Sequence, residues 1–402
     1  MCRFEPAKGL PLISRCRLPL AGWQYLLGAL RAPKPSAGAR LGLASHPAKG
    51  LLLFPPPMAA LRFVVLALLL LTPTTLSARS LDIYFIDVEG GQATLIVTPA
   101  GESLLIDAGY GRDSRDPDRI LAALRDAGME RIDFLLVTHF HNDHVGGVPE
   151  LATRIPIGTF IDYGDPLGTS YGADRMTLRS FALYEPVRKD RPHLTPQPGE
   201  RLPLAGVDAT VVSSGGTLLS TPLPGGGQPN AACANLEHHP EDGTENFRSL
   251  GIVLRYGAFS FLDVGDLSGD TLPQLFCPRN LIGEVSVYLI AHHGNYDSDA
   301  PAVYSALNPR VAVMNNGPTK GGDPWTFRTV RSRPGIDLWQ LHASGNPQAQ
   351  NSADDLIANV DGQECEGHWI KLTASDDGSF TITNGRTGQT RTYAAESGHQ
   401  RH

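Results

Sequence analysis

Three histidines and one aspartate stand within six residues of this 402-residue chain. They belong to the segment Thr138-His139-Phe140-His141-Asn142-Asp143-His144-Val145-Gly146-Gly147, which directly follows an apolar run typical of a buried strand. In extended backbone, His139 and His141 point to the same side, so both can reach one cation. Asp143 and His144 are adjacent and diverge, which suits a second cation beside the first. A polar turn with solvated histidines is the alternative, but such turns do not concentrate four ligating side chains at this spacing.

A pair of cations held in this way would support hydrolysis. Two divalent metals roughly 3.5–4 Å apart can share a hydroxide, clamp the attacking and leaving oxygens, and lower the pKa of bound water to about 7. No Ser-His-Asp or Cys-His motif for covalent catalysis is visible in the sequence. The pattern therefore predicts metal-assisted hydrolysis by a metal-bound hydroxide.

Hydrophobic periodicity predicts the elements that position this cluster. A helix is expected over 116–127, where apolar residues have helical spacing and Gly128 follows. The weakly patterned stretches 163–202 and 215–245 are expected to be long loops. Strands that alternate with helices in two halves predict an α/β architecture, with sheets inside and helices outside. The expected strands cover 81–88, 93–97, 103–106, 132–137, 250–256, 259–264, 285–290, 311–314, 369–373, 379–383 and 390–393, and further helices are expected at 271–276 and 300–307.

The HxHxDH pattern at 139–144 resembles the signature of the metallo-β-lactamase superfamily. This resemblance implies that residues 79–395 form an αββα four-layer sandwich. The segment 259–267 resembles the strand that delivers the aspartate bridging both metals, and it implies that role for Asp266.

The last metal ligand is expected in the segment Ile290-Ala-His292-His293-Gly294. Other superfamily members have His-Gly at this place, which favours His293 as the ligand and leaves His292 beside it. Strand periodicity does not decide between the two histidines, so both stay candidates.

Two further motifs resemble one branch, the metallo-hydrolase domain of the ComEC-type DNA-internalisation competence proteins. The segment Asp87-Val-Glu-Gly-Gly-Gln92-Ala-Thr94 is similar to the Asp-Val-Gly-Gln-Gly-Asp-Ala opening of that branch. Asn246-Phe-Arg-Ser249-Leu250 is similar to its Asn-x-x-Ser-Leu, and His-His-Gly is typical of it. The similarity covers about residues 81–320 and contains no membrane-channel portion, which implies a free-standing, exported relative.

The sequence also departs from these patterns. The usual third histidine between the first cluster and the bridging aspartate has no clear counterpart, and Asn246 and Ser249 occupy that region. The first metal is then held by fewer protein ligands, which leaves open whether one or two metals bind. Gln92 stands where the branch usually has Asp.

Five residues are candidates for supporting roles. Asp107 ends a predicted strand, where it can orient a ligand histidine through a hydrogen bond or serve as an ordinary turn aspartate. Lys320 can meet an anionic substrate oxygen or be a surface lysine, and His342 can line the pocket or pack near Trp339. Asn246 and Ser249 can contact the first metal or the substrate.

We therefore expect two divalent metal ions, Zn first and Mn second, with Asp266 holding both and Asp143 doubling as proton acceptor. The competence-type resemblance implies hydrolysis of phosphodiester or related ester bonds. Two alternatives stay open. One is a β-lactamase or lactonase, which the missing third histidine disfavours. The other is a metal-binding protein without turnover.

The first 78 residues differ in composition from the rest. Residues 1–57 are basic and rich in Pro and Ala, and we interpret them as a non-native or disordered extension. Residues 58–78 match a secretory signal peptide, with Met58 as start, the apolar run 63–71 and cleavage near Ala78. A buried helix or membrane anchor is the alternative interpretation of that run. We expect an exported protein, periplasmic or secreted, without a stable membrane anchor and with a flexible tail at 396–402.

Charge is unevenly distributed along the chain. Residues 1–78 hold nine Lys and Arg against one acid, and the other 324 residues hold 25 against 40, a net charge of −15. Such an acidic body disfavours binding of long nucleic acid. We expect a small anionic ester as the substrate, and the sequence leaves the oligomeric state open.

Three cysteines follow the predicted signal peptide, at Cys233, Cys277 and Cys365. An exported chain with three cysteines can form one disulfide and keep one thiol, and the sequence does not select the pair.

Overall fold

The computed structural model describes residues 80–111, 114–167, 175–240, 243–298, 300–362 and 365–395. The predicted extension at 1–57, signal peptide at 58–78 and tail at 396–402 lie outside these ranges and stay predictions. Within the described ranges, no helix is both long and apolar enough to cross a membrane.

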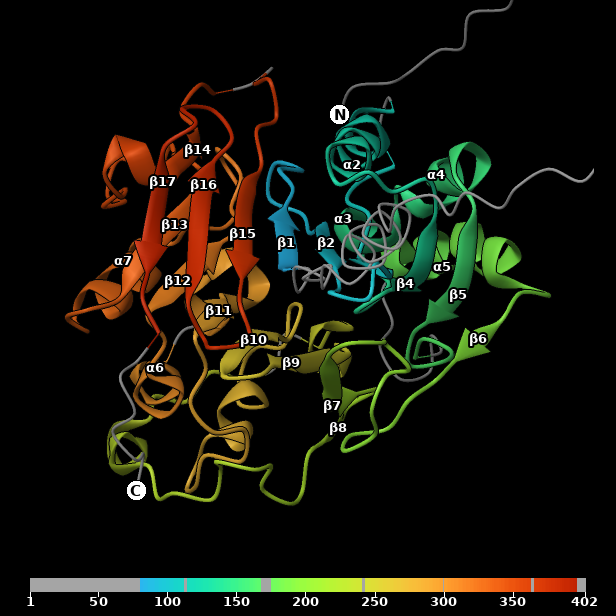
Figure 1. The fold of residues 1–402 in the computed structure, drawn as a ribbon. Coiled ribbons are helices and arrows are strands. Elements are labelled where there is room, and N and C mark those ends of the chain that lie inside the picture. The colour runs from blue at the N-terminus through green and yellow to red at the C-terminus, as the bar shows by residue number, and fades with distance from the viewer. Residues whose placement is uncertain are drawn as a thin grey trace, which may run out of the picture. The chain divides into compact units, whose positions relative to one another are not determined.

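Two sheets form the centre of the described part (Figure 1). The first has nine strands in the order β17-β16-β15-β1-β2-β3-β4-β5-β6. Its half from β3 to β6 is parallel, and the other half is antiparallel. The strands are β1 (Leu81–Phe85), β2 (Thr94–Val97), β3 (Ser103–Ile106), β4 (Ile132–Leu136), β5 (Ile157–Ile161), β6 (His193–Leu194), β15 (Ile370–Ala374), β16 (Phe380–Asn384) and β17 (Thr390–Tyr393).

The second sheet has eight described strands in the order β14-β13-β12-β11-β10-β9-β7-β8. The strands from β10 to β14 are parallel, so their carboxyl ends meet at one edge. The strands are β7 (Asp208–Ser214), β8 (Thr217–Leu218), β9 (Gly251–Tyr256), β10 (Phe259–Asp263), β11 (Val287–Leu289), β12 (Val311–Met314), β13 (Asp337–His342) and β14 (Ile357–Asn359).

The two sheets pack face to face through large apolar side chains. Phe85 of β1 meets Phe261 of β10 with ring centroids 5.7 Å apart, and Phe259 meets Phe380 at 5.5 Å. All four rings are buried. Edge-to-face aromatic pairs of this kind stabilise a core beyond the area that they bury.

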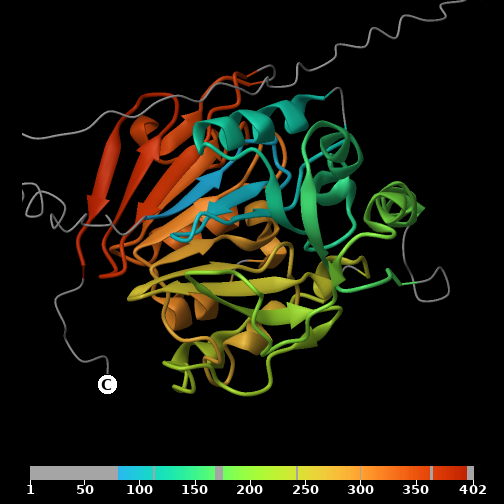
Figure 2. The ribbon, with the colours of Figure 1, turned by 45° about the vertical axis from the view of Figure 1, so that its right-hand side comes forward.

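Helices cover the outer faces of both sheets (Figure 2). Buried Ile120 and Leu124 of α2 and Leu151 of α4 belong to the core that includes the first sheet, and Tyr304 of α6 and Phe327 of α7 pack on the second. The predicted αββα four-layer sandwich is thereby confirmed. The helices are α2 (Arg115–Asp126), α3 (Asn142–Val145), α4 (Val148–Arg154), α5 (Arg175–Arg188), α6 (Pro301–Leu307) and α7 (Pro324–Arg331).

The prediction of a long loop over 163–202 is wrong, because this stretch contains α5 and β6. The inward face of α5 is polar, so the sequence shows no apolar stripe. The Tyr184 hydroxyl donates to Asp162 Oδ2 at 2.7 Å, and Arg188 Nη1 donates to the same carboxylate at 3.1 Å. The helix expected at 271–276 is likewise only a short 3₁₀ turn, η4 (Leu272–Leu275).

Cys233 and Cys277 form a disulfide across 44 residues of sequence, and Cys365 is a free thiol. This pairing resolves the choice that the sequence left open. The bond ties the 3₁₀ turn η2 (Ala231–Asn235) to the segment after η4, next to α6.

We predict that the double variant C233A/C277A is less stable. Closing a loop of this length lowers the entropy of the unfolded chain by an amount equivalent to about 4 kcal/mol. Urea unfolding followed by circular dichroism should therefore show a lower midpoint for the double variant. The control is C365A, which removes a thiol without opening a bridge. Equal midpoints for the double variant and the oxidised parent would contradict the expectation.

Candidate metal centre

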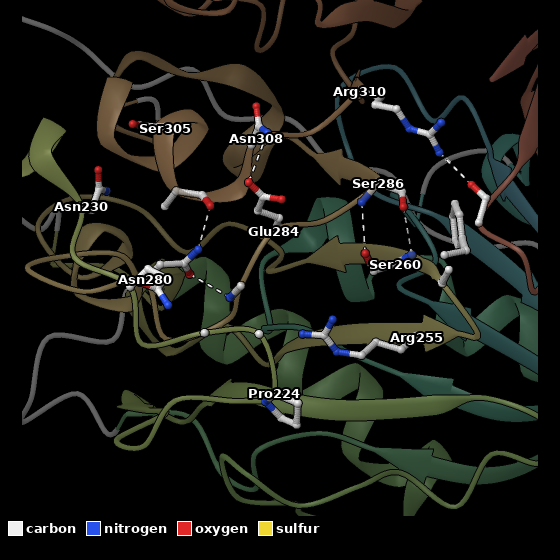
Figure 3. A pocket seen from close by; sticks show the side chains of 18 of the residues that line it. Pro224, Asn230, Arg255, Ser260, Asn280, Glu284, Ser286, Ser305, Asn308 and Arg310 are labelled. Carbon is white, nitrogen blue, oxygen red and sulfur yellow. Dashed lines mark hydrogen bonds between the residues drawn. The ribbon is translucent and has the colours of Figure 1, made fainter. Parts of the chain in front are cut away.

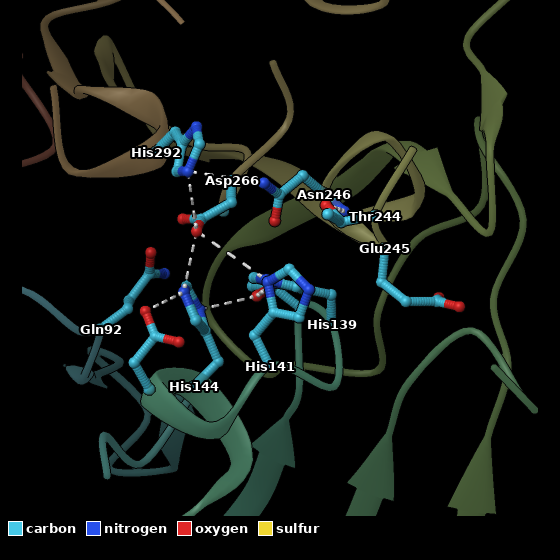
Figure 4. Close-up of polar contacts among 12 residues, drawn as sticks. Gln92, His139, His141, His144, Thr244, Glu245, Asn246, Asp266 and His292 are labelled. Atoms are coloured by element: carbon cyan, nitrogen blue, oxygen red, sulfur yellow. Dashed lines mark hydrogen bonds and ion pairs between the residues drawn. The ribbon is translucent and has the colours of Figure 1, made fainter. Parts of the chain in front are cut away.

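The candidate ligands project from the ends of strands in both sheets. Strand β4 ends at Leu136, and His141, in extended conformation, directly precedes α3. Asp266 follows β10, and His292 and His293 follow β11 in the 3₁₀ turn η5 (Ala291–Gly294). Because the sheets face each other, these strand ends meet at one place (Figure 4).

A sharp turn brings Asp266 to this place. Gly265 has φ +56°, and a Cβ there would lie 2.8 Å from the Thr138 Cβ. Any other residue would thus be strained and would push the two strand ends apart. The backbone N–H of Leu250 also donates to the Thr138 carbonyl at 2.8 Å, which joins the two sheets beside the ligands.

Four buried side chains form the first group: Asp143, His144, Asp266 and His293. One ligand atom from each lies within 4.8 Å of all the others. His144 Nε2 is 3.1 Å and His293 Nε2 is 3.2 Å from Asp266 Oδ2, and His293 Nε2 is 3.3 Å from Asp143 Oδ2. Two imidazoles and two carboxylates are a common donor set for a transition-metal ion.

The second group consists of His139, His141 and, again, Asp266. His139 Nε2 lies 2.9 Å from His141 Nδ1 and 3.8 Å from Asp266 Oδ2. Asp266 is therefore common to both groups. Its Oδ1 is buried and has no hydrogen-bond partner among the described residues. This unpaired Oδ1 belongs to a carboxylate whose Oδ2 lies near histidines of both groups, and it fits a cation, since burying it unpaired is costly.

The two carboxylates are charged in this environment. Burial by itself raises the pKa of Asp266, but His144 and His293 beside it hold that pKa well below its usual range. Burial acts on Asp143 in the same way, and His144 and Lys320 outweigh it, so the pKa of Asp143 is also well below its usual range. Both side chains are in the form that binds cations.

The histidines differ in protonation. Burial and the charge of His144 hold the pKa of His139 well below its usual value, so this ring is neutral. Burial also lowers the pKa of His144, but Asp266, Asp143 and Asp107 outweigh it and hold the pKa well above the usual value. The His144 imidazolium is thus the countercharge of the buried carboxylates, and a bound cation would displace its proton.

Asp107 lies behind His144. Its Oδ2 is 2.7 Å from His144 Nδ1, and it accepts hydrogen bonds from the Thr138 hydroxyl at 2.7 Å and the Thr138 backbone N–H at 2.8 Å. Asp107 is fully buried. The contact with Nδ1 turns the other ring nitrogen of His144 toward Asp266, which is how carboxylates orient metal-binding histidines.

His292 and His293 occupy different positions. His293 belongs to the first group, whereas His292 Nε2 lies 3.9 Å from Asp266 Oδ2 and 3.4 Å from Asn246 Nδ2. His292 Nδ1 lies 2.9 Å from Asp297 Oδ1. Both histidines have positive φ, 48° and 56°, which turns the two rings in different directions. The geometry favours His293 as the ligand.

Asn246 lies beside His292, and Ser249 follows Asn246 by three residues. Asn246 opens the 3₁₀ turn η3 (Asn246–Arg248) and faces His292 and Asp266 (Figure 4). Ser249 is fully buried, and its hydroxyl has no hydrogen-bond partner among the described residues. No third histidine joins the second group in the part of the chain that the structure describes.

Lys320 contacts the first group directly. Its ammonium forms an ion pair with Asp143 Oδ2, and its side chain is 35% exposed. The Lys320 Nζ also lies 5.7 Å from the centroid of the Tyr110 ring, a residue that no sequence motif indicated. Lys320 is thus at the boundary between the ligands and solvent, where a substrate would arrive.

His342 does not line this site. It is fully buried, and its Nε2 lies 3.0 Å from Asp87 Oδ2, so of the two possibilities the structure favours a packed histidine. The sequence could not show this, because 255 residues separate the two partners.

Gln92 and Asp263 are additional buried polar neighbours of the site. Gln92 Nε2 donates to both carboxylate oxygens of Asp263, at 3.1 and 2.9 Å, and the Gln92 N–H donates to the Asp143 carbonyl at 3.1 Å. Burial raises the pKa of Asp263 to about 7. Sequence reasoning missed Asp263, and its place at the end of a strand, three residues before Asp266, was the available signal.

A separate cavity of about 1210 Å³ lies near the beginning of β10, away from the carboxyl end that carries Asp266 (Figure 3). Its polar side chains bind one another or the backbone, as with Asn308 Nδ2 and Glu284 Oε1 at 3.2 Å. None of the metal-ligand groups among the described residues lies in it. The candidate metal ligands therefore lie outside this cavity.

Comparison with known proteins agrees with this geometry. Residues 86–229 match the family model described as "Metallo-beta-lactamase superfamily". An atrochrysone carboxyl ACP thioesterase of Aspergillus fumigatus is 41% identical over 66 residues, 16% of this chain and 20% of that protein. A UPF0173 metal-dependent hydrolase of Cupriavidus necator is 25% identical over 261 residues, 60% of this chain and 77% of that protein. The chain spans about a fifth of the length of the first curated relatives that it matches.

A solved structure titled as a new diphosphatase from the PhnP family aligns at 15% identity with a TM-score of 0.34. The alignment covers 65% of this chain and 94% of that chain. A likeness at this level carries no argument. The family match covers residues 86–229, about a third of the chain, and the two facing sheets with outer helices are consistent with the metallo-β-lactamase fold.

We predict that His293→Ala lowers the amount of metal bound per chain, whereas His292→Ala leaves it close to that of the parent. His293 contributes a donor atom to the first group, while His292 points to Asn246 and Asp297. Elemental mass spectrometry after incubation with Zn²⁺ and gel filtration measures the ratio. A loss in His292→Ala equal to that in His293→Ala would show that the assignment is wrong.

Proposed function

We propose that this protein is an exported metal-dependent hydrolase that uses two divalent cations to cleave phosphodiester or related ester bonds. The observation that carries the proposal is the sharing of Asp266 between two ligand groups. Zn²⁺ is the first choice because imidazole and carboxylate donors suit it, and Mn²⁺ is the second.

Two sets of side chains would each hold one cation. His139, His141 and Asp266 would hold one cation, and Asp143, His144, Asp266 and His293 would hold the other. Such cations supply a hydroxide at neutral pH and polarise the bond that is cleaved. The set of His139, His141 and Asp266 lacks a third histidine, so we expect it to bind its cation more weakly.

Asp143 and Lys320 would serve proton transfer and substrate binding, respectively. Asp143 is charged, and its Oδ2 contacts both His293 and Lys320, which supports a role as proton acceptor. The Lys320 ammonium lies beside it and can bind an anionic oxygen of the substrate. Asp107 keeps the His144 ring in a single orientation throughout.

A small substrate agrees best with the charge of the chain. The net charge of −15 after residue 78 opposes long polyanions, so nucleotides, short oligonucleotides or phosphorylated head groups are preferred. The competence-type motifs also support a phosphodiester. The apolar run at 63–71 supports export.

Cleavage of a carboxylic ester or thioester is the second candidate. It is favoured by the match to the Aspergillus thioesterase and by a match to hydroxyacylglutathione hydrolase of Stenotrophomonas maltophilia, 39% identical over 62 residues, 15% of this chain and 21% of that protein. Hydrolysis of a cephalosporin dye would instead support a β-lactamase.

We predict that the metal-loaded protein hydrolyses bis(p-nitrophenyl) phosphate and that Asp266→Asn lowers the rate by at least about 100-fold. Asn keeps the shape of the side chain but removes the charge that both ligand groups share. Parallel assays with a thioester and a cephalosporin dye distinguish the alternatives. Full activity in Asp266→Asn would refute the mechanism, and absence of turnover on all three substrates would favour a binding protein.

We predict that Lys320→Ala raises KM for the anionic substrate by about tenfold, because one charge-assisted contact contributes roughly 1.5 kcal/mol or more. Lys320→Arg keeps the charge and should restore most of the affinity. Steady-state kinetics at several substrate concentrations separate KM from kcat. A KM that is unchanged in Lys320→Ala would remove Lys320 from the substrate site.

A further inference from the structure

A second cluster of metal-ligating side chains lies outside the catalytic centre. Asp87 follows β1, His342 ends β13, and Cys365 lies between β14 and β15. Cys365 Sγ is 3.2 Å from Asp87 Oδ2 and 3.4 Å from His342 Nε2, and the last two atoms are 3.0 Å apart. Asp87 and His342 are fully buried, and Cys365 is partly exposed.

We propose that Asp87, His342 and Cys365 form an additional metal site that binds one cation of the Zn²⁺ class. The proposal does not depend on the hydrolytic function, because none of these residues belongs to the groups around Asp266.

The donor set carries the first argument. A thiolate, an imidazole and a carboxylate from three distant segments converge on one point, with all three donor atoms within 4.8 Å of one another. Zn²⁺ takes these three ligand types in a tetrahedral arrangement. Glu89 Oε1 is 3.8 Å from Cys365 Sγ and is the nearest carboxylate for a fourth position.

Charge balance carries the second argument. Asp87, Glu89 and Asp116 face the two guanidinium groups of Arg115 and Arg119. Arg119 Nη1 contacts Asp87 Oδ2 at 2.9 Å, and its Nη2 lies 3.3 Å from Cys365 Sγ. With the thiol protonated and His342 uncharged, this set of groups is negative by one charge. A divalent cation that displaces the thiol proton to solvent adds one positive charge and brings the set to neutrality.

The same surroundings disfavour a nucleophilic cysteine. Burial and the neighbouring Asp87 raise the pKa of the Cys365 thiol to about 12. Reactive cysteines need a lowered pKa, so this thiol is a poor nucleophile without a cation. Metal binding overcomes this by replacing the proton directly.

The position of the cluster gives the site a structural role. Asp87 comes from the first sheet and His342 from the second, so one cation would join the two sheets. The loop that starts at Asp87 leads to Gly90 and Gly91. A Cβ on Gly90 would lie 2.8 Å from the Lys320 Cβ, and one on Gly91 2.3 Å from the Asp143 carbonyl oxygen. The cation would thereby hold the loop that packs against the catalytic ligands.

Cobalt(II) titration tests the proposal, because a cobalt–thiolate bond has a near-ultraviolet charge-transfer band that imidazole and carboxylate ligands do not give. The parent carries Cys2→Ser and Cys16→Ser, so that Cys365 is its free thiol beside the Cys233–Cys277 disulfide. We expect the band in the parent, its loss in Cys365→Ser, and at least about tenfold weaker cobalt affinity in His342→Ala. His293→Ala is the matched control and should keep the band.

Four results would overturn the proposal: no band in the parent, a band that persists in Cys365→Ser, unchanged affinity in His342→Ala, or loss of the band in His293→Ala. The last would assign the thiolate to the catalytic centre. A further measurement uses the parent alone, so its result cannot be caused by misfolding of a variant. Excess Zn²⁺ should displace Co²⁺ from the parent and remove the charge-transfer band, and a band that persists at saturating Zn²⁺ would also overturn the proposal.

Discussion

The buried carboxylate of Asp266 is the constraint on which the rest of the site depends. It lies in contact with histidines from two groups, and one of its oxygens has no hydrogen-bond partner in the described structure. A charge in such a place is costly unless cations compensate it. Without metal, His144 and Lys320 provide the positive charge around the two acidic ligands. The site is thus arranged so that divalent cations can take over a role that protons and a lysine fill in their absence.

The architecture supplies this arrangement by bringing strand ends together. Parallel strands in each sheet end at the same edge, and the aromatic pairs between β1, β10 and β16 hold the sheets face to face. The turn at Gly265 then fits against Thr138 with no room for a side chain. Ligands separated by more than a hundred residues reach one another because the core fixes the spacing of the sheets.

The departure from the superfamily pattern has a chemical consequence. The second group contains two histidines and the shared aspartate, with Asn246 and His292 beside it in place of a third histidine. A cation there would keep open positions for water or substrate, which agrees with a binding site completed by an anionic ester. The Asp87 cluster, with its thiol, has a different donor set and lies behind the neighbouring loop.

The sequence by itself indicated the HxHxDH candidates through local spacing and an α/β architecture through periodicity, and the αββα class followed from the family resemblance of that motif. It also indicated Asp266 and the His292–His293 pair, although not which histidine faces the acid. The sequence did not predict helix α5, because its buried face is polar and uses Tyr184 and Arg188 to hydrogen-bond Asp162. Only the tertiary structure decided the Cys233–Cys277 pairing, the contact of Lys320 with Asp143 and the placement of His342 against Asp87. These contacts join residues far apart in the chain, and their distances are set by the packing of the two sheets, which no local pattern contains.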